Sequence, residues 1–151
     1  MKNQILDIKA ALQILKSAQD VFEAIVEPTK MSNYFISKSN GKMEEGKQIV
    51  WQFPEFDMSF PIRVGKIEKN RYISYYWTID GIELFVEITL TPKDSKTTIV
   101  TITEKSRNND EAGIKWLKSN TEGWANFLAC LKAYLEYGIN LRKGAFDFLK
   151  G

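Results

Sequence analysis

The sequence predicts an α+β domain in which a seven-stranded antiparallel sheet curls around a long C-terminal helix, with one or two short helices after the first strand. Near the C-terminus, apolar residues recur at the i, i+3, i+4 and i+7 spacing of a helix with one broad apolar face. These are Trp124, Phe127, Leu128, Leu131, Tyr134 and Leu135. Before them, about seven segments show the alternation of half-buried strands. A helix closing over a sheet buries both apolar surfaces at once.

The first strand and the first helix are marked by separate signals. Apolar residues alternate with mostly polar ones over residues 6–14, which predicts a strand with one buried face: Leu6, Ile8, Ala10, Leu12 and Ile14. Ser17-Ala18-Gln19-Asp20 then resembles a helix-capping sequence. Pro28 should end this helix, because the residue before a proline is pushed out of the helical region. A second short helical turn is expected from Thr29 to Phe35.

From Asn40-Gly41 onward, the pattern is typical of a sheet. Strands are expected over residues 49–53, 60–65, 71–77, 82–90 and 97–104. Pro61 places its strand at a sheet edge or beside a bulge. Asp80-Gly81 is a strong signal for a tight hairpin, and residues 92–96 are expected to form another turn.

The expected start of the long helix is Ser119-Asn120-Thr121-Glu122, a second capping-box pattern. Residues 105–118 before it are polar and are interpreted as a loop, with room for a short helix over 111–117. Gly138 is the candidate end of the long helix. Four apolar residues beyond it are expected to pack back onto the domain: Ala145, Phe146, Phe148 and Leu149.

Composition excludes several classes of function. The 151 residues fit one domain spanning residues 1–151, with 44% hydrophobic and 26% charged residues, as in ordinary globular proteins. The net charge is only +2 and no dense basic stripe is present, so nucleic acid is not an expected partner. No apolar run approaches the roughly 18 residues of a membrane span, so no membrane insertion is expected. A lone cysteine allows no internal disulfide, and the N-terminus lacks the apolar core of a secretion signal. Both favour a cytoplasmic location.

Histidine is absent from the chain. Its absence removes every histidine-based catalytic triad and most zinc sites. No catalytic set, metal site or cofactor is therefore expected. The single Cys130 has no histidine to activate it, and we interpret it as a small packing residue on the long helix.

The chain resembles the helix-grip, START-like (SRPBCC) superfamily of lipid-transfer, pollen-allergen and polyketide-cyclase domains. Within it, the chain is most similar to the family named for the activator of the heat-shock-protein-90 ATPase, from residue 5 to about 142. The resemblance depends on the order and spacing of five groups: Ser17…Val21-Phe22…Ala24…Pro28, Arg63-Val64 with Ile67-Glu68, Ile73-Ser74-Tyr75-Tyr76-Trp77, Val86…Leu90…Pro92, and Gly123-Trp124 with Leu128, Leu131, Lys132 and Leu135-Glu136. Many members carry a histidine near the end of the last strand, where this chain has Thr103-Glu104-Lys105. No role of that histidine carries over.

A sheet gripping one helix should leave an apolar cavity between them. The candidate lining residues are Trp51, Phe53, Phe60, Ile62, Tyr75, Trp77, Leu84, Val86, Trp124, Leu128 and Leu131. Ordinary core packing is the alternative explanation for all of them. Tyr75, Arg63 and Glu104 are candidates for orienting a ligand.

The two charged candidates each leave two interpretations open. Glu104 shares a strand face with Val100 and Ile102, which puts it either at the cavity mouth or, the favoured interpretation, in solvent at the strand end. Arg63 faces outward by parity, which favours pairing with a carboxylate such as Glu83 or Glu87. A bulge after Pro61 would turn Arg63 inward instead.

Other polar and aromatic residues are assigned to the surface. The run 72–77 places bulk on both strand faces, and a patch partly covered by neighbouring side chains is favoured over a dimer or partner surface. Four basic residues are interpreted as a solvated face: Lys132, Arg142, Lys143 and Lys150.

These observations predict a binding domain without chemistry of its own, which holds a small hydrophobic molecule such as a lipid, sterol or aromatic compound. The resemblance implies an alternative, a chaperone-linked module that contacts heat-shock protein 90. A cyclase- or hydrolase-type enzyme is a third hypothesis, because Tyr, Arg and carboxylate side chains can also carry such reactions.

Overall fold

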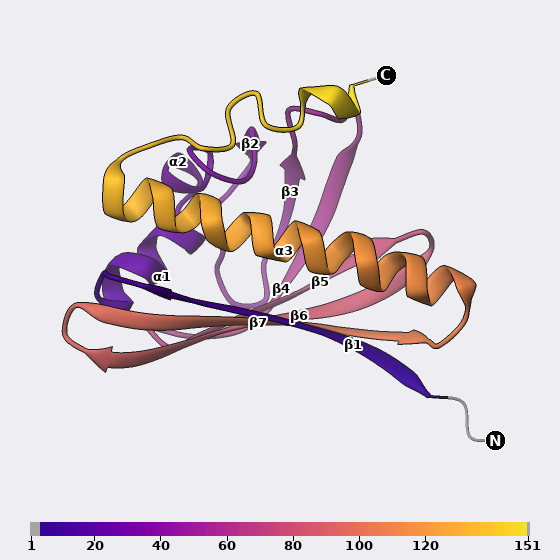
Figure 1. Cartoon of the computed structure of the whole chain (residues 1–151), viewed down its shortest axis with the longest axis horizontal. Helices are drawn as coiled ribbons and strands as arrows, with labels where there is room; N and C mark the ends of the chain where they lie inside the picture. The colour runs from indigo at the N-terminus through magenta and orange to yellow at the C-terminus, as the bar shows by residue number, and fades with distance from the viewer. Residues whose placement is uncertain (1–3, 151) are drawn as a thin grey trace.

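Seven antiparallel strands form one curved sheet in the computed structural model, which describes residues 4–150 (Figure 1). The strand order is β1-β7-β6-β5-β4-β3-β2. The strands are β1 Ile5–Ile14, β2 Lys38–Ser39, β3 Gln48–Gln52, β4 Ser59–Glu68, β5 Tyr72–Ile79, β6 Ile82–Asp94 and β7 Thr97–Asn108. All neighbours pair antiparallel. The predicted fold class is confirmed, and β2 is the strand that the sequence pattern did not predict.

Two short helices follow β1, as expected. Helix α1 spans Ala18–Val26, and the Ser17 hydroxyl accepts a hydrogen bond from the backbone N–H of Asp20 at 3.1 Å, which confirms the capping signal. Helix α2 spans Pro28–Met31, and Pro28 takes its first helical position, where the missing N–H costs no hydrogen bond. The regular helix is shorter than the predicted Thr29–Phe35, but turns continue to Phe35, whose N–H donates to the Met31 carbonyl at 2.9 Å.

The long helix α3 spans Glu111–Tyr137 without interruption. The Asp110 carboxylate caps it by accepting a hydrogen bond from the N–H of Gly113 at 2.7 Å. Gly138 ends it in the left-handed conformation, with φ 65°. The predicted end is thus confirmed.

The predicted loop over residues 105–118 is wrong, although residues 111–117, where a short helix was allowed, are helical as the first part of α3; the predicted helix start at Ser119 is also wrong. Strand β7 continues to Asn108, and α3 begins at Glu111. No proline interrupts residues 111–137, and Trp116 is buried in the core, which holds the first turns of the helix on the sheet. Tertiary packing therefore overrides the local capping signal of residues 119–122.

The hairpin turns were predicted with mixed success. Asp80 and Gly81 both have positive φ, 52° and 77°, as a two-residue hairpin turn requires. The turn predicted over residues 92–96 is present but shorter than expected, because β6 runs to Asp94 and Pro92 pairs with Thr98 of β7. Only Ser95 and Lys96 connect these two strands.

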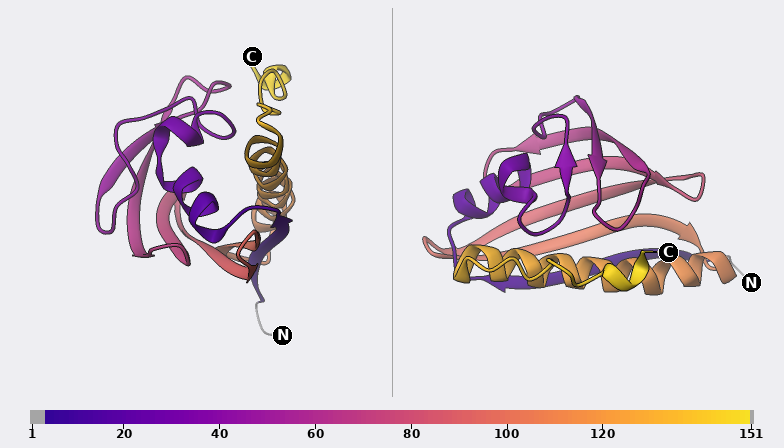
Figure 2. Two further views of the ribbon diagram at one scale, coloured as in Figure 1. Left: turned by 90° about the vertical axis from the view of Figure 1, so that its left-hand side faces the viewer. Right: turned by 90° about the horizontal axis from the view of Figure 1, so that it is seen from above.

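Helix α3 lies across the concave face of the sheet and closest to β1 (Figure 2). Two hydrogen bonds hold it there: Lys132 Nζ donates to the Gln13 carbonyl at 2.9 Å, and Glu136 accepts from the Leu15 N–H at 2.9 Å. Helices α1 and α2 occupy one end of the space between α3 and the sheet. The cavity described below lies in the same space, lined by α3, by the loop between β3 and β4 and by residues just after α2.

Candidate functional site

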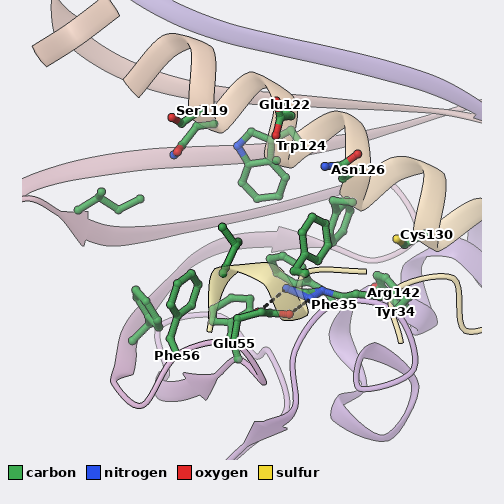
Figure 3. A pocket seen from close by; sticks show the side chains of 18 of the residues that line it. Tyr34, Phe35, Glu55, Phe56, Ser119, Glu122, Trp124, Asn126, Cys130 and Arg142 are labelled. Carbon is green, nitrogen blue, oxygen red and sulfur yellow. Dashed lines mark hydrogen bonds and ion pairs between the residues drawn. The ribbon is translucent and has the colours of Figure 1, made fainter. Parts of the chain in front are cut away.

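A cavity of about 540 Å³ lies between α3, the loop that joins β3 to β4, and the C-terminal segment, defined here as residues 139–150 (Figure 3). Aromatic side chains dominate its lining. They are Tyr34, Phe35, Phe53, Phe56, Phe60, Trp77, Trp124, Phe127, Phe146 and Phe148. Polar groups lie mainly on the side of α3, where Ser119, Asn120 and Asn126 line it. Such a lining of apolar walls and few polar groups is typical of small-molecule sites.

Four of the predicted lining residues border this cavity: Phe53, Phe60, Trp77 and Trp124. The other seven lie in the packed core and do not reach it, and each has at most 2% of its surface exposed: Trp51, Ile62, Tyr75, Leu84, Val86, Leu128 and Leu131. The strand residues of both groups face inward, and Trp124, Leu128 and Leu131 all lie on the buried face of α3, so neither strand alternation nor helical spacing separates core from cavity.

Several lining residues were missed by sequence reasoning. Phe35, which follows α2, lies at the centre of the aromatic wall, with its ring 4.7 Å from that of Phe127 and 5.1 Å from that of Phe53. Tyr34 beside it donates a hydrogen bond to the Ala24 carbonyl at 2.7 Å. The apolar side of the turn after Pro28 was the available signal, but it does not reveal that this turn faces α3.

Glu104 is fully buried, with 0% of its surface exposed. Its carboxylate accepts three hydrogen bonds: from Trp77 Nε1 at 2.8 Å, Trp124 Nε1 at 3.0 Å and Asn120 Nδ2 at 3.0 Å. The favoured interpretation of a solvated strand end is therefore wrong. Glu104 does not line the cavity, but all three of its donors do.

Tyr75 is buried and close enough to Glu104 to feel its charge. Burial raises the pKa of Tyr75 well above its ordinary value, and the charge of Glu104 adds to that effect. The Tyr75 hydroxyl is buried and has no hydrogen-bond partner among the described residues. Because Tyr75 does not reach the cavity, this hydroxyl does not face a ligand bound there.

Arg63 lies on the convex face of the sheet, as its parity predicted. Its guanidinium is 3.2 Å from a Glu83 carboxylate oxygen and 4.0 Å from the centre of the Tyr76 ring. The Tyr76 ring in turn stacks on the ring of Phe85. The irregularity in β4 falls between Val64 and Ile67, after Arg63, so it does not turn Arg63 inward. The outer aromatic patch is partly covered by its neighbours, as favoured, and Arg63 does not touch the cavity.

Arg142 corrects the prediction of a solvated basic face. Its guanidinium donates two hydrogen bonds to the Glu55 carboxylate, at 3.0 and 2.9 Å, and only 14% and 4% of the two side chains are exposed. It also lies 4.9 Å from the centre of the Phe146 ring. Burial lowers the pKa of Arg142, and the charge of Glu55 opposes that effect. This ion pair ties the C-terminal segment to the loop between β3 and β4.

The C-terminal segment packs back less than expected. Phe146 is half-buried, whereas Phe148 remains 79% exposed at the cavity rim and Ala145 is also exposed. Cys130 is buried on the wall of the cavity, and burial raises the pKa of its thiol, which disfavours the reactive thiolate.

Among residues 4–150, no group of three or more His, Cys, Asp or Glu side chains could hold a metal ion. None of the helices in that same range is long and apolar enough to cross a membrane.

Comparison with known proteins gives one family and several structural relatives. The sequence model of the family described as "Activator of Hsp90 ATPase homolog 1-like protein" matches residues 16–136. The crystal structure of the protein SSP2350 from Staphylococcus saprophyticus is 33% identical, with a TM-score of 0.78 over 91% of this chain and 96% of that chain. No curated protein matches the chain.

Two further structures share the fold at lower identity. The Aha1 dimer from Colwellia psychrerythraea is 17% identical, with a TM-score of 0.75 over 88% of this chain and 98% of that chain. The di-domain ARO/CYC BexL from the BE-7585A biosynthetic pathway is 15% identical, with a TM-score of 0.72 over 87% of this chain and 46% of that chain.

Proposed function

Because the chain belongs to the family of activator of Hsp90 ATPase homolog 1-like proteins, we propose that it is one binding domain that holds a small hydrophobic molecule between α3 and the sheet. The aromatic cavity is the observation that carries this proposal. Its volume of about 540 Å³ lies within the range of roughly 300–1,000 Å³ that small-molecule sites occupy.

The lining favours a flat, largely uncharged ligand over a charged one. Arg142 and Glu55 neutralise each other, and the remaining charged side chains of the wall, Lys118 and Glu122, are also of opposite sign. The aromatic rings offer faces and edges on which an aromatic or sterol skeleton can pack. The fold neighbour BexL comes from a biosynthetic pathway, which is consistent with a small organic ligand.

Polar groups on α3 would orient the ligand. Asn126 lines the cavity, and its side chain takes part in none of the hydrogen bonds found within residues 4–150, so its amide is free to bind a carbonyl or hydroxyl group. Arg63 and Tyr75, the earlier candidates for this role, do not reach the cavity. We therefore assign orientation to Asn126 in their place.

The proposal is tested with N-phenyl-1-naphthylamine, an uncharged probe that fluoresces in apolar sites. Gly123 lines the cavity, and a Cβ added to it would meet no atom within 4 Å, so Gly123→Leu has room at its Cβ and adds an isobutyl group to the cavity wall. Replacing a glycine inside a helix should also stabilise the protein, by about 1 kcal/mol. Ala125→Leu, at an exposed position of the same helix, is the matched control.

We expect saturable binding by the wild type and by Ala125→Leu, and binding at least about tenfold weaker, or 1.4 kcal/mol, by Gly123→Leu. Equal binding by all three proteins would place the probe outside the cavity and contradict the proposal. Absence of binding to the wild type would contradict it as well.

The family match itself favours a second candidate function, contact with heat-shock protein 90. Adding this protein should then change the ATPase rate of the chaperone, and an unchanged rate removes the candidate. The hypothesis places this contact on the convex face of the sheet and at the helix ends, so Gly123→Leu, in the middle of α3 and on the cavity wall, should leave the effect intact. A chaperone partner would place the chain in the cytoplasm, where the lone thiol of Cys130 stays reduced.

A further inference from the structure

The buried carboxylate of Glu104 joins two elements that face each other across the cavity wall. Trp77 comes from β5, whereas Asn120 and Trp124 come from α3. All three line the cavity and donate to Glu104, which lies behind them and is fully buried. Glu104 forms no ion pair within residues 4–150, so these three N–H groups are its means of satisfying a buried charge.

These hydrogen bonds fix the orientation of both indole rings in the cavity wall. Each indole ring has a single N–H donor, and that donor is aimed at Glu104. The ring carbons are therefore left to face the cavity. Figure 3 shows Trp124 in this way, with its six-membered ring extending into the cavity and its nitrogen farther back. The centres of the two rings are 6.0 Å apart, at 37°.

We propose that Glu104 is a positioning residue that holds Trp77 and Trp124 with their carbon edges toward the ligand, and that it thereby sets the shape and the apolar character of this wall. The inference rests on the proposed function of the cavity. Nothing in the proposal requires Glu104 to touch the ligand.

Glu104→Gln is the most informative variant, because it keeps the shape of the side chain and changes one acceptor into a donor. Oε1 accepts from Asn120 and Trp124, and Oε2 accepts from Trp77. In either orientation of the new amide, its NH2 group faces an indole N–H, and two donors cannot pair. One tryptophan therefore loses its acceptor and the other keeps it.

The first measurement is the ¹H–¹⁵N spectrum of the indole N–H groups. In the wild type, the signals of Trp77 and Trp124 should lie downfield and exchange slowly with water, since both donate to a carboxylate. In Glu104→Gln, one of the two should move upfield and exchange faster, whereas Trp51 and Trp116 should be unchanged. If neither signal moves, the positioning role is wrong.

The second measurement is affinity for N-phenyl-1-naphthylamine, with Thr98→Val as the control. Thr98 lies on the same strand and is equally buried, and its hydroxyl donates to the Lys16 carbonyl at 2.9 Å, but it does not line the cavity. We expect both variants to lower the thermal midpoint. Glu104→Gln should weaken probe binding by about fivefold or more, because a tryptophan without its acceptor no longer holds its carbon edge toward the ligand, whereas Thr98→Val should leave affinity within about twofold.

The outcomes separate this inference from the proposed function. If the wild type binds no probe, the proposed function fails, and the indole spectrum alone decides whether Glu104 positions the tryptophans. If the spectrum changes but both variants bind the probe equally well, Glu104 does not set the wall and the inference is overturned. If Glu104→Gln does not fold, Asn120→Ala removes one of the three donors at a half-buried helix position. In Asn120→Ala the indole N–H signal of Trp124 must then shift, because Asn120 and Trp124 donate to the same oxygen, Oε1 of Glu104. An unchanged Trp124 signal overturns the inference.

Discussion

The ion pair between Arg142 and Glu55 should hold the C-terminal segment over the cavity. We consider Arg142→Met, which keeps most of the side-chain volume and removes the charge, together with Glu55→Gln and the double variant. The pair joins residues 87 positions apart, so no local structure holds them together. The two side chains are among the few charged groups of the protein that are mostly buried.

The coupling energy follows from the geometry of the pair. Two charge-assisted hydrogen bonds of 3.0 and 2.9 Å join the groups, and only 14% and 4% of the side chains are exposed. Hydrogen bonds to charged groups contribute about 1.5–3 kcal/mol net, and a bidentate pair with little solvent screening belongs at the upper end of that range. We therefore expect a coupling energy of about 2–3 kcal/mol in a double-mutant cycle.

The assay is urea unfolding of the four proteins, combined with hydrogen exchange of the segment. The Ala145 and Leu149 amides donate to carbonyls within the segment, so they should exchange faster in each single variant. Lys150 and Asp147 form an exposed pair at 3.3 Å, and their cycle is the control, with a coupling close to zero. If the Arg142–Glu55 coupling is as small as the control, the pair does not hold the segment and the reasoning is refuted.

Three further predictions follow from single groups. Gly138→Ala should lower the free energy of unfolding by about 1 kcal/mol, because φ is 65° at this helix end and alanine is strained there. Gly123→Ala, inside α3, should raise the free energy of unfolding by about the same amount. Urea midpoints of the two variants that move in the same direction would contradict this. Burial raises the pKa of Tyr34 and Tyr75 well above 10, and burial with a hydrogen bond to Glu87 raises that of Tyr72 to about 12. Above about pH 10 the unfolded state loses these protons and the folded state keeps them, so the unfolding free energy should fall as pH rises. The test is the tyrosinate absorbance of the folded protein, and ionisation of all six tyrosines together near pH 10 would refute the prediction. Cys130 should react slowly with thiol reagents at neutral pH, because it is buried and its pKa is raised; labelling as fast as in urea would show otherwise.

The sheet could be predicted from sequence because alternation reports directly which strand face is buried. The buried faces of the longer strands, the Asp80-Gly81 hairpin and the end of α3 at Gly138 all depend on local chemistry, and the structure agrees with them, although β2 was not predicted and β6 and β7 extend further than expected. The start of α3 could not be predicted in this way. It depends on Trp116 finding a place in the core, which is a tertiary contact.

The cavity could be expected from the fold, but its place could not. It depends on which part of α3 faces the loop between β3 and β4, and on the return of the C-terminal segment. Arg142 is half of a buried ion pair whose partner lies 87 residues away. In the sequence, it is indistinguishable from a solvated basic residue.

The burial of Glu104 could not be predicted from the sequence either, because it also depends on contacts with residues distant in the chain. Its parity with Val100 and Ile102 correctly placed it on the inner face of β7. Its burial, however, depends on N–H donors from Asn120 and Trp124, which the sequence interpretation placed at or near the start of a helix. Since the helix begins nine residues earlier than Asn120, those donors extend from its interior directly over the strand.

The most direct test of the central claim is to locate bound N-phenyl-1-naphthylamine by intermolecular nuclear Overhauser effects in the wild-type protein. The cavity predicts contacts between the probe and the rings of Phe35, Trp124 and Phe127, which line it from two sides. Contacts confined to Tyr76 and Phe85, on the convex face of the sheet, would contradict the claim that the space gripped by α3 is the binding site.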